Sequence, residues 1–377
     1  MSNSPTPAEK PRKTTPSSRS LQSTDAPDLR YRPQDPKTYQ PGIGLIGCGG
    51  ITKDHLRAYK AAGYRVLALC DLDLENAERR RKEYYPNAAV YQDAAELLAR
   101  EDIEVVDIAT HPGVRPKLIE AALLAGKHVL SQKPFVLDLD VGERLVALAE
   151  SCDRKLAVNQ NARWAPHFSY AREAIRQGLL GAVNGIHMSV HWDHRWVEGT
   201  PFAKIKHLIM YDYAIHWFDM VNCLMRDQPL RIFASTMRTQ TQTLMPPLGA
   251  QAMIEYEHGQ ASLSFDAATM YGRQDRTYIA GDRGSLYSLG PNEKEQTLTL
   301  YTEAGIAKPT LVGSWFPDGF HGAMGELLCA IEENRRPLHS AADNLFSLSL
   351  CFAAIHSAET HQAVVPGAIR RLPSETE

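Results

Sequence analysis

The chain has 377 residues and a mass of 42.0 kDa, more than one domain of ~150 residues needs, so we expect two domains. Its residues are 44% apolar and 23% charged, as in ordinary soluble globular proteins, and its net charge is -3 with a pI near 6.5. These values argue against a basic nucleic-acid-binding module, and no apolar run approaches the ~18 residues of a membrane-spanning helix.

Residues 1–40 differ in composition from the rest of the chain. They contain seven of the 23 prolines and carry a charge of +3, from seven Lys and Arg against four Asp and Glu. Such a segment buries too little apolar surface to offset its ordering entropy, so alone it should be disordered. It also lacks the apolar core of a secretion signal. We expect a leader without function; an arm that wraps a neighbouring subunit is the alternative.

From Pro41, short apolar runs alternate with helical periodicity, which predicts a parallel sheet covered by helices on both faces. The predicted strands are Gly42–Gly47, Arg65–Asp71, Ala89–Tyr91, Val105–Thr110, His128–Ser131 and Leu156–Asn159. The predicted helices include Thr52–Ala62, Leu74–Glu83, Arg115–Ala125 and Val141–Cys152. This pattern indicates a doubly wound, dinucleotide-binding domain over residues 41–164.

Residues 165–377 show a different pattern of predicted helices and strands, and they form the second predicted domain. After a helix around His167–Gln177, many strands with few helices between them predict a large, open, mostly antiparallel sheet. The predicted strands are Gly185–His194, Leu230–Thr239, Ala250–Tyr256, Gln260–Ala267, Thr277–Gly281, Ser285–Leu289 and Thr297–Tyr301. Helices over Gly322–Glu333 and Ala342–Gln362 close the chain. The predicted fold class is α/β, a Rossmann domain followed by an α+β domain.

Several other chemistries are disfavoured. The six cysteines lie far apart with no CxxC pair, which indicates reduced thiols in a cytoplasmic protein. His187, His191 and His194 lie near one another, but on a strand the third would point to the opposite face, so we predict no metal site. The sequence also lacks the G-x-S-x-G motif of serine hydrolases.

The first positive signal is the segment Gly47-Cys48-Gly49-Gly50-Ile51-Thr52 between a predicted strand and a predicted helix. Glycines let the backbone approach a diphosphate at the helix N-terminus. Asp71, 24 residues after Gly47, ends the next strand and can bind an adenosine ribose. Its charge would repel a 2′-phosphate, so we expect NAD rather than NADP. Arg79–Arg81 come too late to lie beside that ribose unless their helix bends back.

Two further signals carry acid–base groups. Lys133 follows a predicted parallel strand, whose carboxyl end faces the cofactor crevice, and Pro134 fixes the turn after it. Asp212 and His216 are four residues apart, so on a helix they would share one face. Their significance depends on whether Lys133 faces the same cavity.

Five segments together resemble the glucose–fructose oxidoreductase, inositol dehydrogenase and MocA family: GLIGCGGIT, LALCDLD, VVDIAT, AALLAGKHVLSQKP and DYAIH. The resemblance is near-continuous from Ile43 to about Ala363. It implies a Rossmann domain and a second domain whose open sheet often forms the subunit interface, hence a homo-oligomer (dimer or tetramer). It also implies NAD(P)-dependent oxidation or reduction of sugars, inositols or related polyols.

The resemblance assigns roles to particular residues. Lys133, Asp212 and His216 would form the catalytic group. The expected cofactor contacts are Gly47, Gly49, Gly50, Ile51, Asp71, Thr110, His111, Gln132 and Lys133. Polyols need convergent polar groups and an aromatic face, and the candidate substrate contacts are Asn161, Arg163, Trp164, His194, Trp196 and Asp212.

The chain also departs from the family pattern at three places. Gln132 replaces the usual Glu, Arg115 stands where a His is usual, and His207–Met210 replaces a glycine cluster. These changes leave the cofactor motifs intact and alter the substrate end.

The expected reaction is hydride transfer between a secondary alcohol and nicotinamide. His216 would be the general base, Lys133 would stabilise the developing alkoxide, and Asp212 would orient His216 or bind a neighbouring hydroxyl. An enzyme that uses NAD transiently, for elimination or glycoside cleavage, is the first alternative. A sugar or NAD sensor without catalysis is the second.

Overall fold

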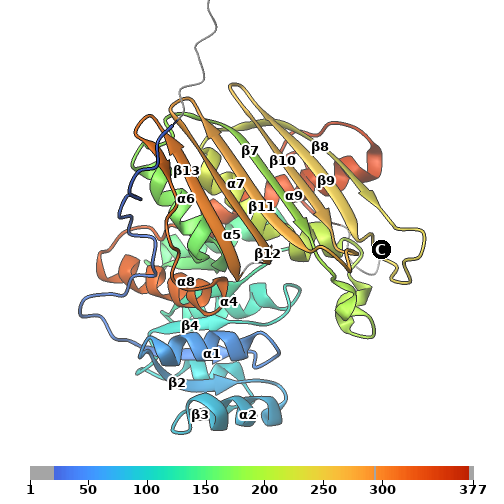
Figure 1. The fold of residues 1–377 in the computed structure, drawn as a ribbon. Helices are drawn as coiled ribbons and strands as arrows, with labels where there is room; N and C mark the ends of the chain where they lie inside the picture. Colours follow the sequence, from blue (N-terminus) through green and yellow to red (C-terminus); the bar gives the residue numbers. More distant parts are fainter. Residues whose placement is uncertain (1–20, 293, 373–377) are drawn as a thin grey trace, which may run out of the picture.

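Two β-sheets organise the chain (Figure 1). The computed structural model describes residues 21–292 and 294–372. A six-stranded parallel sheet comes first in the sequence, and an eight-stranded, mostly antiparallel sheet follows. The predicted fold class is confirmed.

The first sheet is doubly wound. Its strand order is β3-β2-β1-β4-β5-β6, and every neighbouring pair is parallel. All residues of β1, β4 and β6 are buried, as expected where helices cover both faces. The strands are β1 Gly42–Ile46, β2 Arg65–Cys70, β3 Ala89–Tyr91, β4 Val105–Ile108, β5 His128–Gln132 and β6 Leu156–Asn159. The chain reverses direction across the sheet between β1 and β4, which is where such sheets bind ligands.

Helices connect these strands, and three of them begin at an aspartate. The side chains of Asp73, Asp93 and Asp138 accept a hydrogen bond from a backbone N–H in the first turn of α2, α3 and α5. The helices are α1 Thr52–Ala61, α2 Leu74–Tyr84, α3 Ala94–Leu98, α4 Arg115–Leu124 and α5 Leu139–Ser151. The helix α3, which has five residues, was not predicted from the sequence.

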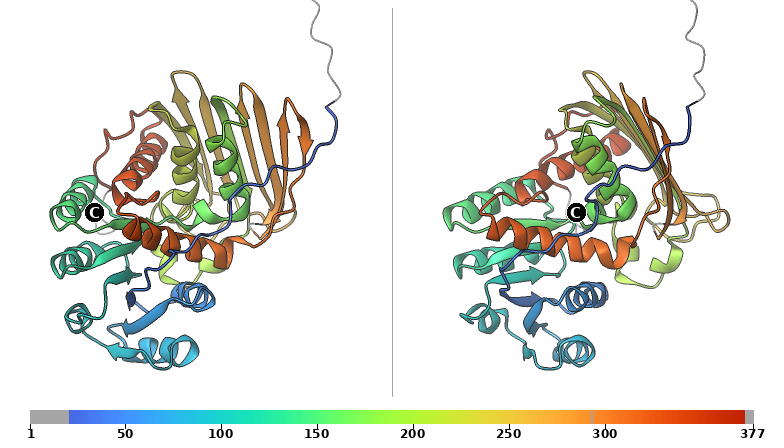
Figure 2. Two further views of the ribbon diagram at one scale, coloured as in Figure 1. Left: turned by 90° about the vertical axis from the view of Figure 1, so that its left-hand side faces the viewer. Right: turned by 60° about the vertical axis from the view of Figure 1, so that its left-hand side comes forward.

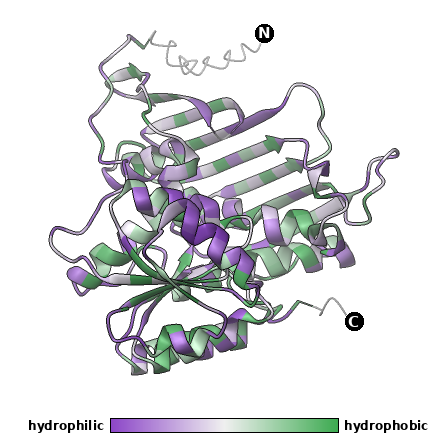
Figure 3. Ribbon diagram, turned by 90° about the horizontal axis from the view of Figure 1, so that it is seen from below, coloured by the Kyte–Doolittle hydropathy of each residue, from purple (hydrophilic) through white to green (hydrophobic). Residues whose placement is uncertain are grey.

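The second sheet has the order β14-β13-β12-β11-β7-β10-β9-β8, and only β7 and β10 pair in parallel. Buried and exposed residues alternate along β9 and β10, and the same alternation of hydropathy is visible across the sheet in Figure 3. One face therefore packs on helices and the other is open. The strands are β7 Val183–His191, β8 Pro229–Met237, β9 Gly249–Tyr256, β10 Gln260–Asp266, β11 Gln274–Gly281, β12 Gly284–Asn292, β13 Glu295–Thr302 and β14 Gly305–Ala307.

Four further helices pack on the two parts of the molecule. In Figure 2, α6 Pro166–Arg176, α7 Ile215–Met225 and α9 Ala341–Thr360 cover one face of the second sheet. The helix α8 Trp315–Glu332 instead packs on α1, where Phe320, Met324 and Leu327 share a core with Leu56 and Tyr59. Part of the predicted second domain thus covers the first sheet. Within residues 21–292 and 294–372, we find no helix with the length and apolarity to cross a bilayer.

Residues 21–40 run in an extended path from the edge of the second sheet to the first (Figure 2). Gln22 and Thr24 form backbone hydrogen bonds with Ile306 of β14, and the Glu332 carboxylate accepts the N–H groups of Lys37, Thr38 and Tyr39. Polar contacts with the rest of the chain thus hold residues 21–40 as an extended arm. The other half of the predicted segment lies outside the described residues.

Candidate active site

The glycine turn after β1 leaves open space at the N-terminus of α1. Gly47 has a φ of +91°, and a Cβ there would lie 3.0 Å from the carbonyl atoms of Ala109, so the turn requires glycine. At Gly49 and Gly50 a Cβ would meet no atom within 4 Å, and Ile51 is 36% exposed. The backbone of this turn is thus accessible to an anion such as a diphosphate.

Charged side chains flank the turn on the β2 side. The Asp71 carboxylate accepts the N–H groups of Cys48 at 2.6 Å and Asp73 at 2.9 Å, which places it beside the turn. Arg80 also reaches the turn: its Nη2 lies 2.9 Å from the Gly49 oxygen. The sequence-based expectation for Arg79–Arg81 concerned only a place beside the adenosine ribose, and this contact of Arg80 with the glycine turn was not foreseen.

The remaining predicted cofactor contacts follow β4 and β5. Thr110 has a buried hydroxyl with no hydrogen-bond partner among the described residues, and His111 is exposed. Gln132 is buried, and its Oε1 accepts the N–H of Lys133 at 2.7 Å. An open glycine turn, a carboxylate after β2 and an unsatisfied hydroxyl after β4 fit a dinucleotide.

Arg115 fixes the turn that carries Lys133. Its guanidinium is 1% exposed and donates to the carbonyl oxygens of Gln132, Pro134 and Thr110. It therefore holds the residues before and after Lys133 together, and burial lowers its pKa to about 10. The sequence analysis noted this arginine only as a departure from the family pattern; its position after β4 was the available signal.

A buried polar network lies behind Gln132, and the sequence analysis missed it. His55 is fully buried; its Nδ1 lies 2.7 Å from Asp107 Oδ2, and its Nε2 lies 3.1 Å from Gln132 Nε2. The hydroxyl of Tyr59 donates to the same Asp107 oxygen. The only signals in the sequence were a histidine early in α1 and an aspartate within the apolar strand β4.

Lys133 and Asp212 meet across the two parts of the molecule. Lys133 Nζ lies 2.7 Å from the backbone oxygen of Asp212 and 3.2 Å from its Oδ1. Both side chains are about one-fifth exposed, at 18% and 20%. An ammonium from the end of β5 and a carboxylate 79 residues later thus form a partly accessible ion pair.

His216 lies close to this pair and is held neutral. Its Nδ1 is buried without a hydrogen-bond partner among the described residues, and its ring lies 5.4 Å from that of Trp315. Burial and the positive charge of Lys133 lower the pKa of His216 well below its usual value of 6.5. The free imidazole can therefore accept a proton at neutral pH.

A second histidine, His194, faces the same charges. Burial lowers its pKa to about 4, Asp212 opposes this shift, and Lys133 adds to it. The indole N–H of Trp196 donates to His194 Nδ1 at 3.3 Å, which leaves the His194 proton on Nε2. Trp196 itself is 60% exposed. These two predicted substrate contacts thus lie together beside the Lys133–Asp212 pair.

The segment around Asp212 does not form one continuous α-helix. Leu208–Tyr213 (η4) is a π-helix, and α7 begins at Ile215. Asp212 and His216 therefore belong to different helical segments, so the argument from a shared α-helical face does not apply to them. Wide π-helical turns often occur at functional sites. Here the Asp212 oxygen accepts a hydrogen bond from Lys133.

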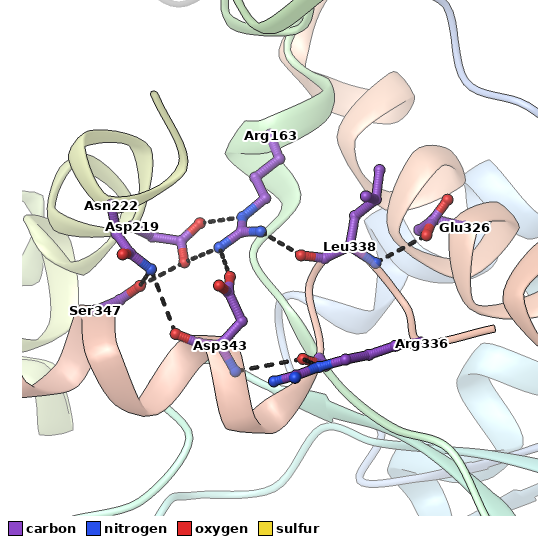
Figure 4. Close-up of polar contacts among 9 residues, drawn as sticks. Arg163, Asp219, Asn222, Glu326, Arg336, Leu338, Asp343 and Ser347 are labelled. Carbon is purple, nitrogen blue, oxygen red and sulfur yellow. Dashed lines mark hydrogen bonds and ion pairs between the residues drawn. The ribbon is translucent and has the colours of Figure 1, made fainter. Parts of the chain in front are cut away.

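Three predicted substrate contacts are engaged by protein groups. Arg163, in the 3-10 turn η1 Asn161–Trp164, is 2% exposed and donates to Asp219, Asp343 and the Leu338 oxygen (Figure 4). Asn161 Oδ1 accepts the indole N–H of Trp315. Trp164 is 4% exposed, with its ring 4.9 Å from that of His339. These side chains connect η1 to later helices, so we do not assign them to a substrate.

The described residues contain no group of three or more His, Cys, Asp and Glu side chains that could hold a metal ion. Of the three clustered histidines, His187 contacts the hydroxyl of Ser262 at 2.7 Å from the open face of the second sheet. His194 instead lies beside Lys133 and Asp212, as described above.

Comparisons with known proteins match both halves of the chain. The family model "Oxidoreductase family, NAD-binding Rossmann fold" matches residues 42–160, and the model "GFO/IDH/MocA C-terminal domain" matches residues 168–287. The chain belongs to the GFO/IDH/MocA oxidoreductase family. The resemblance noted in the sequence is thereby confirmed, and so is the expectation of a dehydrogenase.

Individual GFO/IDH/MocA members align along most of the chain. A D-apiose dehydrogenase of Paraburkholderia graminis is 28% identical over 85% of this chain and 88% of its own length. An inositol 2-dehydrogenase of Rhizobium meliloti is 28% identical over 84% of this chain and 96% of its own. The crystal structure of an oxidoreductase from Agrobacterium radiobacter in complex with NAD+, L-tartaric acid and magnesium has a TM-score of 0.78 at 22% identity. That comparison covers 88% of this chain and 99% of the other.

Proposed function

We propose that this enzyme transfers a hydride between a secondary alcohol of a sugar, glycoside or polyol and NAD. The main support is the 3.2 Å contact between Lys133 and Asp212, with His216 near enough for Lys133 to lower its pKa. The relatives named D-apiose and inositol dehydrogenase support the substrate class. Residues 41–164 would form the cofactor domain and residues 165–377 the substrate and oligomerisation domain.

The cofactor would be held by the glycine turn and the ends of β2, β4 and β5. The turn Gly47–Ile51 would receive the diphosphate at the N-terminus of α1, and the Asp71 carboxylate would bind the adenosine ribose. The negative charge of Asp71 would repel the 2′-phosphate of NADP and therefore favours NAD. Thr110, His111, Gln132 and Lys133 would complete the site. When bound, nicotinamide supplies the hydride acceptor.

Side chains of the protein would transfer the hydroxyl proton and stabilise the negative charge on the reacting oxygen. In alcohol oxidation, neutral His216 takes the hydroxyl proton, and in the reverse direction it returns it. Lys133 donates a hydrogen bond to the reacting oxygen and stabilises negative charge there. Asp212 holds the Lys133 ammonium in place and binds a neighbouring hydroxyl. His194 would donate from Nε2 to the substrate, and the exposed face of Trp196 would cover its C–H groups.

A substrate screen tests the proposal. Monosaccharides, glycosides and inositols are incubated with NAD, and the absorbance of the reduced cofactor is followed. Accumulation of NADH with one class of polyol is the expected result. Substrate turnover without net NADH would replace the proposal with transient use of NAD, and binding without turnover would replace it with a sensor.

The variant His216→Ala tests the assigned base. Loss of a positioned proton acceptor should lower turnover about 10²–10⁴-fold, while the dissociation constant of NADH stays close to that of the wild type. Steady-state kinetics and fluorescence titration with NADH measure the two quantities. His258→Ala is the matched control, because the His258 side chain is 84% exposed. Normal turnover in His216→Ala would remove this residue from the mechanism.

The quaternary structure and location are also proposals. The open face of the second sheet carries exposed apolar side chains, among them Phe233 and Met253 at 44% and 50% exposure. We propose that this face joins subunits of a homo-oligomer, a dimer or tetramer. The six cysteines form no disulfides, which fits the reducing conditions of the cytoplasm.

A further inference from the structure

The glycine turn departs from the usual dinucleotide-binding pattern at its third position, where Thr52 replaces glycine or alanine. Thr52 is fully buried, and its hydroxyl donates to the Gly49 oxygen at 2.8 Å. Arg80 donates to the same oxygen at 2.9 Å and reaches the Gly50 oxygen at 3.4 Å. The Thr52 hydroxyl, absent from the usual motif, and Arg80 of α2 thus hold the carbonyl groups of the turn.

The surroundings of Arg80 hold its side chain against the glycine turn. It lies on α2 and is 8% exposed, although arginine side chains rarely become so buried. Glu83, one turn later on α2, accepts from its Nη1 at 3.2 Å. Its Nε is buried without a partner among the described residues. The neighbouring Arg79, by contrast, is exposed, and its Nη2 donates to the Asn76 side chain at 2.6 Å.

The orientation of these carbonyls decides what the turn offers to an anion. Because a peptide unit is planar and trans, its C=O and the next N–H point in opposite directions. Holding the Gly49 and Gly50 oxygens towards Arg80 therefore turns the N–H groups of Gly50 and Ile51 away from it. Glycines have unusual backbone freedom, so without such contacts these peptides could rotate and present oxygen to an anion.

We propose that Arg80, assisted by Thr52, is a positioning residue for the diphosphate of the cofactor. It holds two peptide units with their N–H groups directed to the open side of the turn, and it places a positive charge behind them. The contacts also explain how a threonine is accommodated at the third position. This inference rests on the proposed use of NAD and names one residue outside the dinucleotide motif, Arg80, and one departure within it, Thr52.

The test compares Arg80→Met with Arg79→Met. Both changes remove one arginine charge from α2, but only the first removes the contacts to the turn. Fluorescence titration measures the dissociation constant of NADH, and displacement of NADH measures that of adenosine, which has no diphosphate. We expect Arg80→Met to weaken NADH binding roughly tenfold or more, because the lost hydrogen bonds are charge-assisted. Adenosine binding should change less than twofold, and Arg79→Met should resemble the wild type.

Thr52 supplies a second variant that does not alter charge. Thr52→Ala should weaken NADH binding in the same direction but less, and Thr52→Ser should restore it, because serine retains the hydroxyl. In steady-state kinetics the KM for NAD should rise while kcat at saturating NAD changes little. A merely structural role would lower kcat as well.

The outcomes separate this inference from the proposed function. If the wild type binds NADH and Arg80→Met binds it equally well, the positioning role is wrong. It is also wrong if adenosine loses as much affinity as NADH, or if Arg79→Met has the same effect. If the wild type binds no NADH, the proposed function fails first, and this inference fails with it.

Discussion

His216 shows how two neighbouring groups set the protonation of one residue. Burial and the Lys133 ammonium both disfavour a positive charge on its ring, so its pKa lies well below 6.5. The same ammonium would stabilise negative charge on a substrate oxygen. One lysine thus favours both a neutral base and a developing alkoxide, which the reaction needs together.

This arrangement predicts an unusual pH dependence for alcohol oxidation. The active form of His216 is neutral, and a lowered pKa keeps it neutral at lower pH. The acid limb of kcat/KM should therefore fall below pH 6.5. In Lys133→Met the positive neighbour is absent, so the His216 pKa should move back upwards. NMR titration of the imidazole in that variant checks the cause, and an acid limb at or above pH 6.5 in the wild type would contradict the assignment.

The residues of the site differ in how far the sequence could reveal them. Two signals predicted that Lys133 and Asp212 belong to one site: the place of Lys133 after a parallel strand, and the family resemblance. Arg163 was a reasonable substrate contact, but its partners Asp219 and Asp343 lie 56 and 180 residues later in the chain. No local pattern shows that such distant carboxylates will enclose an arginine. Only the tertiary structure distinguishes a buried ion pair from a binding residue.

At the scale of elements, the irregular segments were the hardest to predict. The apolar periodicity of the sequence identified the strands of the first sheet to within one or two residues, because a buried parallel strand is a continuous apolar run. The π-helix η4 was missed, since its sequence does not differ visibly from an α-helical one. This π-helix carries Asp212, which contacts Lys133, so part of the site lies on the least predictable element.

The ion cluster around Arg163 stabilises three elements at once (Figure 4). Asp219 on α7 is fully buried and accepts from Arg163 at 2.6 and 2.7 Å, and Ser347 on α9 donates to it at 2.8 Å. Asp219 also lies one turn after His216 on α7. The cluster therefore fixes the helix that carries the proposed base.

Asp219→Asn should destabilise the protein strongly. It leaves the Arg163 charge buried with a weaker partner, and breaking a buried pair typically costs ~3–5 kcal/mol of unfolding free energy. Urea unfolding measures this loss. The control is Glu143→Gln, which breaks the exposed Arg370–Glu143 pair on α5 and should leave the unfolding free energy nearly unchanged. Equal effects of the two changes would show that the buried cluster has no special importance.

At the scale of the whole molecule, the second sheet has one face that none of the described helices covers. A row of side chains crosses this face in register: Phe233 on β8 pairs with Met253 on β9, and the row continues through Ser262, His187 and Tyr278. It is apolar at one end and polar in the middle. The exposed Phe233 and Met253 at its apolar end suit contact with another protein subunit better than contact with water.

Met253→Asp tests whether this face joins subunits. A charge in the apolar end of the row should shift the protein towards monomers, as measured by light scattering during gel filtration. Met245→Asp is the control, because Met245 is 75% exposed in the loop between β8 and β9, outside the row. A wild type that is already monomeric, or a Met253→Asp variant that keeps its mass, would rule out this interface.

Buried histidines such as His167 and His339 have lowered pKa values, so we expect the fold to be sensitive to acid. His167 on α6 is the clearest case, because burial lowers its pKa from 6.5 to about 3 and neither ring nitrogen has a partner among the described residues. Between these two pH values the unfolded chain binds a proton that the folded chain does not, so stability falls as the pH drops below 6.5. Urea unfolding should give a lower unfolding free energy at pH 5 than at pH 7.5. His167 alone should contribute about 2 kcal/mol to this loss. His167→Phe should reduce that loss by this amount and His258→Phe should not; an undiminished loss in His167→Phe would show that His167 is protonated in the folded protein.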